Sequence, residues 1–187
     1  MRLLNGLVII IFFMLIWNSC TIYDKEFDNP VDYKANEEKG IRTPSLVFYP
    51  KNQMVSLGDS VLIGSHIVFK DDSVESFSGF QIRINFSNNF MELDTIIPGQ
   101  LITDSLQSVP LFTFTYENEN IIDIYAYFLD TVRLDVNETG HLADLVFKPL
   151  ESGYDSIYYD INGCTILNYQ DSLVNINGIR NAEIIIR

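Results

Sequence analysis

The stretch GFQIRINF, residues 79–86, decides the fold of this chain, because its apolar and polar residues alternate without a break. Its aromatic and aliphatic residues would lie on one face and its polar residues on the other. A period of two is typical of a β-strand with one buried face and one face in solvent. The residues that we expect in the core are Phe80, Ile82 and Ile84, together with Leu145 and Phe147 of a similar stretch.

Seven further segments between residues 45 and 187 have a strand-like composition, rich in β-branched and aromatic residues. Turn sequences such as Leu57-Gly58-Asp59 separate them, and no helical period is sustained, although residues 104–108 could form one turn. This pattern predicts an all-β domain over residues 45–187, a β-sandwich or jelly roll large enough to bury a core. The segments are residues 46–49, 60–69, 111–116, 121–129, 141–149, 156–161 and 183–186.

Residues 1–19 have the features of an export signal peptide. Arg2 supplies a positive charge, and residues 3–17 form an uncharged apolar segment too short to span a membrane comfortably. Ser19-Cys20 follows, which resembles the lipobox of bacterial lipoproteins, where the cysteine is acylated and becomes the new N-terminus. The resemblance implies a lipid anchor on Cys20 in the cell envelope, at the outer membrane facing the periplasm or the cell surface. A plain secretory signal or an uncleaved anchor is the alternative.

Residues 20–44 differ in composition from both of their neighbours. Charges are dense, Pro30 and Pro44 interrupt the segment, and no apolar period is sustained. Such a composition predicts a solvated, flexible tether. The tether would lift the domain away from the membrane.

The net charge restricts the class of partner. The 187-residue chain has a formal charge of −13, and removal of residues 1–19, whose only charged side chain is Arg2, would make it −14. An excess of carboxylates repels nucleic-acid phosphates and anionic lipid headgroups. We therefore expect no nucleic-acid partner, and contact with the membrane through the lipid anchor only.

The sequence has no motif for catalysis, for metal binding or for a cofactor. His66 and His141 are far apart in the chain, and Cys164 is a single thiol with no base next to it. Metal sites need three or four converging ligands, and a nucleophile needs an adjacent base. We expect structural roles for these residues, with Cys164 as a small buried apolar side chain, and we expect that the chain is not an enzyme.

Several motifs of the domain resemble those of cohesin domains. They follow one another in the order of that family and cover nearly all of residues 45–187. The motifs are VSLGDSV (residues 55–61), GFQI (79–82), PGQL (98–101), GHLADLVFK (140–148) and EIII (183–186).

The cohesin resemblance implies a nine-stranded jelly roll without catalytic activity. Known cohesins bind dockerins, which are small calcium-loaded modules, through one flat sheet face. The resemblance therefore implies that this chain recruits a protein partner, of the dockerin type or another. Two alternatives stay open: a carbohydrate-binding module of the same architecture that takes a polysaccharide, and a structural domain of an envelope complex.

The strand predicted around residues 122–128 (IDIYAYF) adds two tyrosines to the candidate surface. If its isoleucines point inward, the tyrosines point outward about 7 Å apart, where they could stack on sugar rings or anchor a protein. The reverse orientation would bury both rings. The candidate contact residues are the outward side chains of this strand and of the strand at residues 79–86, namely Gln81, Arg83, Asn85, Asp123, Tyr125 and Tyr127.

Overall fold

The alternating stretch at residues 79–86 forms the strand β4 (Gly79–Asn85). Its apolar residues Phe80, Ile82 and Ile84 are at most 1% exposed, while the polar residues between them are half-buried. The prediction of a half-buried strand is therefore confirmed. The computed structural model describes residues 29–70, 77–103, 110–128, 139–168 and 170–187.

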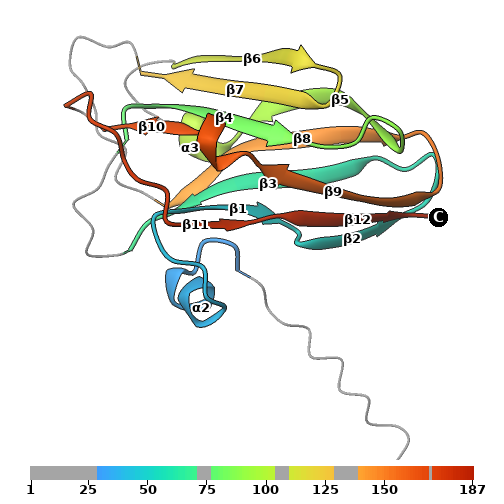
Figure 1. Ribbon diagram of the computed structural model, residues 1–187, viewed down its shortest axis with the longest axis horizontal. Helices are drawn as coiled ribbons and strands as arrows, with labels where there is room; N and C mark the ends of the chain where they lie inside the picture. The colour runs from blue at the N-terminus through green and yellow to red at the C-terminus, as the bar shows by residue number, and fades with distance from the viewer. Residues whose placement is uncertain (1–28, 71–76, 104–109, 129–138, 169) are drawn as a thin grey trace, which may run out of the picture.

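β4 belongs to a seven-stranded sheet, whose strands follow one another from the bottom to the top of Figure 1. Their order is β2 (Asn52–Val55), β12 (Ala182–Ile186), β9 (Gly153–Tyr159), β4, β7 (Ile121–Tyr127) and β6 (Leu111–Asn118), with β10 (Thr165–Leu167) also paired to β4. β2 and β12 run parallel, and the other pairs are antiparallel. β9 and β10 share one edge of β4, because each pairs with a different end of it.

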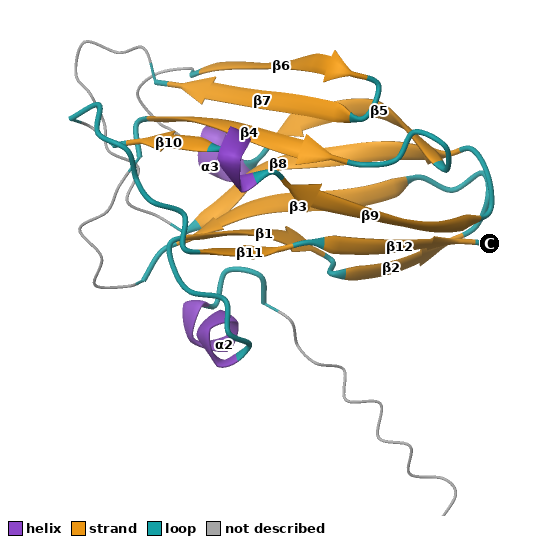
Figure 2. Cartoon of the chain, viewed as in Figure 1, coloured by secondary structure: helices purple, strands orange, loops and turns teal. Residues whose placement is uncertain are grey.

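A five-stranded sheet lies behind the first sheet in the view of Figures 1 and 2. Its order is β11 (Gly178–Arg180), β1 (Ser45–Tyr49), β3 (Val61–Val68), β8 (Gly140–Pro149) and β5 (Met91–Pro98). Only β1 and β11 are parallel in this sheet. The two sheets enclose one core, so the predicted all-β sandwich is confirmed.

The core lies between the two sheets, and a buried hydrogen bond inside it joins one sheet to the other. Leu145 and Phe147 of β8 are fully buried, as predicted. Tyr159 of β9 stacks on Phe48 of β1, with ring centroids 3.9 Å apart. The Tyr159 hydroxyl lies 2.9 Å from the Oγ of Ser65 on β3, so this pair of hydroxyls joins the two sheets inside the apolar core.

The described residues form twelve strands, where the cohesin resemblance implied nine. β5 was not predicted, because a register shift between Leu93 and Thr95 breaks the alternation of its sequence. Met91 and Leu93 point inward at a spacing of two, but the next buried residue is Ile96. Sequence analysis also missed β2, β10 and β11, which have only four, three and three residues and are too short to show a period.

Residues 29–44 include a short helix, α2 (Tyr33–Glu38), where the sequence predicted a flexible tether. The Asp32 side chain caps its first turn, and the buried Asn36 amide donates to the carbonyl oxygens of Pro30 and Asp32. These local hydrogen bonds stabilise the turn without an apolar period, so composition alone did not reveal it. Figure 2 shows α2 outside the sandwich, beside β11 and β1.

A second short helix, α3 (Gln100–Thr103), follows β5. The single turn predicted at residues 104–108 lies outside the described residues, as do the export signal, Cys20 and the first part of the tether. None of the helices in the described part of the chain has the length and the apolar character needed to cross a membrane.

Candidate functional site

The predicted contact residues lie together on the outer face of the seven-stranded sheet. β4 and β7 are hydrogen-bonded neighbours, and their register places Gln81 opposite Tyr125 and Arg83 opposite Asp123. The residues between them, such as Ile82 and Ile124, point into the core and are 1% exposed. Both strands therefore have the orientation that the alternation predicted, with the tyrosines outward.

An ion-pair cluster at the centre of this face joins three strands. Nε and Nη2 of Arg83 donate to Oδ1 and Oδ2 of Asp123, both at 2.9 Å. Nη2 of Arg83 also lies 2.8 Å from Oε2 of Glu117 on β6, and Nε2 of Gln81 donates to Oδ1 of Asp123 at 3.2 Å. A bidentate pair fixes the plane of the guanidinium, so Arg83 is oriented before any partner arrives.

Asp123 was predicted to be an outward contact residue, but its side chain is buried, with only 4% of its surface exposed. It lies on the predicted face, but Arg83 and Gln81 cover its carboxylate. The hydrogen bond from Arg83 lowers the pKa of Asp123, and the same bond raises the pKa of Arg83, so that both groups stay charged. Asp123 therefore positions Arg83 and exposes little surface of its own.

The two outward tyrosines are half-buried, and thus less open than the sequence suggested. Tyr127 lies opposite Gly79 on β4, and a Cβ added to that glycine would be 2.3 Å from Cδ1 of Tyr127. The glycine therefore makes room for the ring over β4. Asn85, at the other end of the strand, is half-buried as well.

A turn interrupts the β9–β10 edge beside Arg83. The 3₁₀ turn η1 (Ile161–Gly163) approaches the arginine stem so closely that a Cβ on Gly163 would lie 2.4 Å from Cδ of Arg83. The N–H of Asp160 donates to the Arg83 carbonyl at 3.0 Å, and the Arg83 N–H donates to Sγ of Cys164 at 3.4 Å. Cys164 is half-buried, where the sequence predicted a buried side chain, and burial raises the pKa of its thiol to about 11, which disfavours the thiolate.

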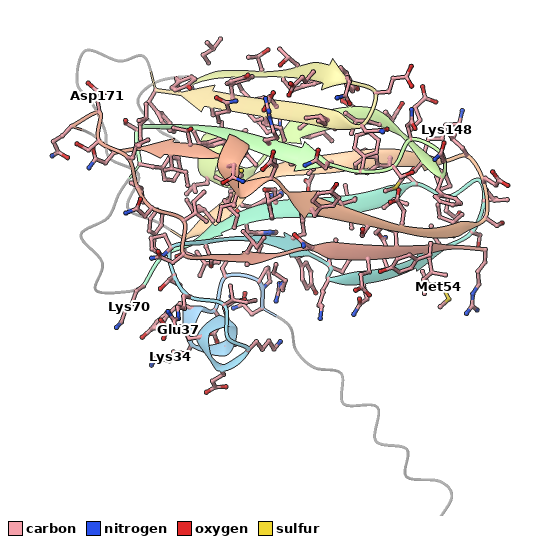
Figure 3. The ribbon with its side chains drawn as sticks, in the orientation of Figure 1. Lys34, Glu37, Met54, Lys70, Lys148 and Asp171 are labelled. Carbon is pink, nitrogen blue, oxygen red and sulfur yellow. The ribbon has the colours of Figure 1, made fainter. Side chains whose placement is uncertain are left out.

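An apolar patch that the sequence analysis missed lies on the same face. We define it as Met54, Ile185, Tyr154 and Tyr158. The register places Met54 of β2 opposite Ile185 of β12, and Ile185 opposite Tyr154 of β9; they are 55%, 39% and 55% exposed. Tyr158 is 45% exposed and lies opposite Asn85, so the patch adjoins the predicted residues. Figure 3 shows Met54 projecting from the edge of the sheet.

The signal for this patch was available in the alternation of β9. Tyr154, Ser156 and Tyr158 point outward, while Ile157 and Tyr159 between and after them are buried. The predicted strand at residues 156–161 covers the second half of β9, and no face was predicted for it. Met54, Ile185 and Tyr154 are neighbours across three strands, while Ser156 separates Tyr154 from Tyr158. Exposed apolar side chains grouped in this way are typical of interaction surfaces.

A histidine pair lies on the outer face of the other sheet. His66 and His141, far apart in the sequence, stack with ring centroids 4.8 Å apart because β3 pairs with β8. Nε2 of His141 is 2.9 Å from Oδ1 of Asp144, and burial, followed by the charge of His141, lowers the pKa of His66 to about 4. In the described part of the chain, no three His, Cys, Asp or Glu side chains are grouped so as to hold a metal ion.

Comparison with solved structures identifies the fold. The sixth cohesin of Acetivibrio cellulolyticus scaffoldin B, solved with a dockerin, matches with a TM-score of 0.61 and 11% identity over 76% of this chain and 98% of that chain. A Clostridium thermocellum cohesin–dockerin complex matches with a TM-score of 0.60 and 10% identity over 76% and 99% of the two chains. A cohesin module of a Clostridium perfringens family 33 glycoside hydrolase matches with a TM-score of 0.59 and 10% identity, over 78% of this chain and 98% of that chain.

The sequence itself matches no protein-family model, and no curated protein is significantly similar to it. At these low identities the structural matches establish the fold alone. The domain therefore has a cohesin-like fold, as its motifs predicted.

Proposed function

We propose that this chain is an envelope-anchored, non-catalytic binding module that recruits a protein partner through the outer face of its seven-stranded sheet. The observation that carries the proposal is the apolar patch next to the Arg83–Asp123–Glu117 cluster on one continuous face. The fold adds support, because cohesins of similar structure were solved in complex with dockerins.

The chemistry of this face suits a protein–protein contact. Tyrosine and arginine supply most of the binding energy in many interfaces once they are desolvated. Here Tyr154 and Tyr158 are exposed, and Arg83 is already oriented by its carboxylate partners. The strands below are hydrogen-bonded along their length, so the backbone loses little freedom when a partner docks.

The charges of this face indicate what the partner carries. Around the single guanidinium of Arg83 are the carboxylates of Asp123 and Glu117, and Glu183 lies on the outer side of β12. We therefore expect an apolar centre on the partner flanked by lysine or arginine. A dockerin-type module or another small domain with this surface would fit.

We further propose that Cys20 carries the lipid and that the protein resides in the cell envelope, at the outer membrane. The support is the signal-like apolar segment that ends at Ser19-Cys20 and the polar sequence that follows it. Mass spectrometry of the membrane-extracted protein should find an acylated N-terminal cysteine. A mature N-terminus elsewhere, or a Cys20→Ala protein that remains in the membrane fraction like the wild type, would refute the anchor.

The binding proposal is tested by affinity capture from the envelope fraction of the source organism. The full-length protein should capture a specific partner, and Tyr154→Ala/Tyr158→Ala should lose most of it. Tyr125→Ala/Tyr127→Ala should weaken capture to a smaller extent, because those rings are half-buried.

The matched control is Leu62→Ala, which removes a side chain of similar exposure, 49%, from the opposite sheet. Capture should weaken as salt is raised, as expected for a charged interface. A partner that all the face variants retain would exclude this face. If no protein is captured, the module is not a recruiter, and the structural-domain alternative takes its place.

A further inference from the structure

A groove lies on the open side of the sandwich, between the edge strands β5 and β6. These two strands belong to different sheets and do not pair with each other. The groove has a volume of about 600 Å³, within the range of small-ligand sites. It is separate from the centre of the proposed protein-binding face.

The base of this groove is apolar, and one wall is an aromatic ring. Phe86 and Leu93 form the base and are 5% and 8% exposed. Tyr116 of β6 is 51% exposed and packs edge-on against Phe114, with ring centroids 6.0 Å apart. The ring is therefore supported on one side and available on the other, as a stacking platform requires.

The rim of the groove is polar and held by its own hydrogen bonds. Nδ2 of Asn88 donates to Oε2 of Glu119 at 2.8 Å, which ties the β4–β5 connection to the β6–β7 hairpin. The Asn120 N–H donates to Oδ1 of Asn118 at 2.9 Å. The Asn88 N–H bonds to Oδ1 of Asn120 at 3.3 Å, so the rim is a preformed network.

The polar groups of this rim indicate the class of ligand. Amides both donate and accept hydrogen bonds, which is what recognition of hydroxyl groups requires. Two carboxylates, Glu92 and Glu119, and no Lys, Arg or His are among the described residues that line the groove. The hydroxyl of Tyr116 is protonated at neutral pH and can donate, and desolvation, followed by the charge of Glu92, raises its pKa further. This lining disfavours anions such as phosphates and uronates.

A second hollow of about 490 Å³ adjoins the groove at Asn118. The two hollows share Phe86 and Asn118 as lining residues. The second adds Ser87 and Asn120, and it ends at the exposed Tyr158. The two adjoining hollows, with Tyr116 in one lining and Tyr158 in the other, offer room beyond a single sugar ring.

We propose that this groove binds a neutral oligosaccharide, with Tyr116 stacked on one sugar ring and the amides of Asn88 and Asn118 bonded to hydroxyl groups. The module would then hold a glycan beside its protein-binding face, which the second hollow reaches at Asn85 and Tyr158. The inference is independent of the protein-binding face, because Tyr116 and Asn118 lie outside it.

The test is a glycan array followed by isothermal titration calorimetry, with the full mature chain solubilised in detergent. The array should carry neutral glucans, xylans, mannans and galactans together with polygalacturonate and sulfated glycans. We expect binding to a neutral glycan and not to its acidic counterparts. Tyr116→Ala should weaken binding about tenfold, and Tyr116→Phe, which keeps the ring, much less.

Two further variants keep the result interpretable. Asn118→Ala should weaken glycan binding even if Tyr116→Ala proves poorly folded, and Leu62→Ala, on β3 of the other sheet, should leave glycan binding unchanged. The proposal is overturned if no neutral glycan binds at millimolar concentration, or if Tyr116→Ala and Asn118→Ala bind as the wild type does. Preference for an acidic glycan, or salt-sensitive binding of an oligolysine peptide in place of a sugar, would overturn it as well.

Discussion

Replacing Tyr159 by phenylalanine removes one hydroxyl from the middle of the core and changes little else. That hydroxyl lies 2.9 Å from Oγ of Ser65, and the two residues are 3% and 0% exposed. Because they belong to different sheets, their hydrogen bond fixes β9 against β3. β9 in turn carries Tyr154 and Tyr158 of the apolar patch.

The expected loss in free energy of unfolding depends on the polar group that each single substitution leaves without a partner. Tyr159→Phe leaves the buried Ser65 hydroxyl without this partner, and Ser65→Ala does the same to Tyr159. A buried polar group that loses its hydrogen bond costs about 1–3 kcal/mol, so each variant should lose that much free energy of unfolding. The double variant removes both polar groups, and its loss should be clearly smaller than the sum of the two single losses.

The assay is urea unfolding at pH 7, followed by circular dichroism, for the wild type and the three variants. Tyr158→Phe is the matched control: its side chain is 45% exposed, and it should unfold like the wild type. Strictly additive losses, or a Tyr159→Phe midpoint equal to that of the control, would show that the hydroxyls do not bond inside the core.

Four further outcomes are expected. Phe80→Ala should lower the free energy of unfolding by about 3–5 kcal/mol, because this ring is 1% exposed, and an unchanged urea midpoint would contradict the packing described. Asp123→Asn should lower the free energy of unfolding at pH 7, because the hydrogen bond from Arg83 lowers the pKa of Asp123 in the folded state. The difference in unfolding free energy from the wild type should shrink as the pH falls below 3.8, and a difference independent of pH would refute this. Burial lowers the pKa of His66 from 6.5 to about 4, so the wild type should lose stability relative to His66→Gln as the pH falls from about 6.5 to about 4. Thermal melts of both proteins across this pH range measure the difference, and a difference in melting temperature that does not change with pH would contradict the lowered pKa. In a Cys20→Ala background, Cys164 should react with iodoacetamide at pH 8 about 100-fold more slowly than in urea, because burial raises its pKa to about 11; equal rates would show an accessible thiolate.

Local alternation was enough to predict much of the fold. β4 and β7 each keep a strict period of two, so both the strands and their outward faces could be assigned from the sequence. β5 could not, because its bulge after Leu93 shifts the buried face by one residue. α2 could not either, since Asp32 and Asn36 stabilise it through side-chain hydrogen bonds that leave no hydrophobic period.

The candidate site was predictable only in part, because its composition depends on pairing between distant strands. The alternation placed Arg83 and Asp123 on outward faces, but only the β4–β7 register shows that they meet and that Arg83 covers the carboxylate. The row of Met54, Ile185 and Tyr154 comes from three segments far apart in the chain. Single-strand periodicity gives the face of each residue and not its lateral neighbours.

Site-specific photo-crosslinking in the intact envelope tests the central claim most directly. A photoreactive phenylalanine analogue in place of Tyr154, which is 55% exposed on the seven-stranded sheet, is compared with the same analogue in place of Leu62, which is 49% exposed on the five-stranded sheet. We expect a discrete crosslinked partner from position 154 and none from position 62. Crosslinking from position 62 alone, or equally from both positions, would contradict recruitment through the outer face of the seven-stranded sheet.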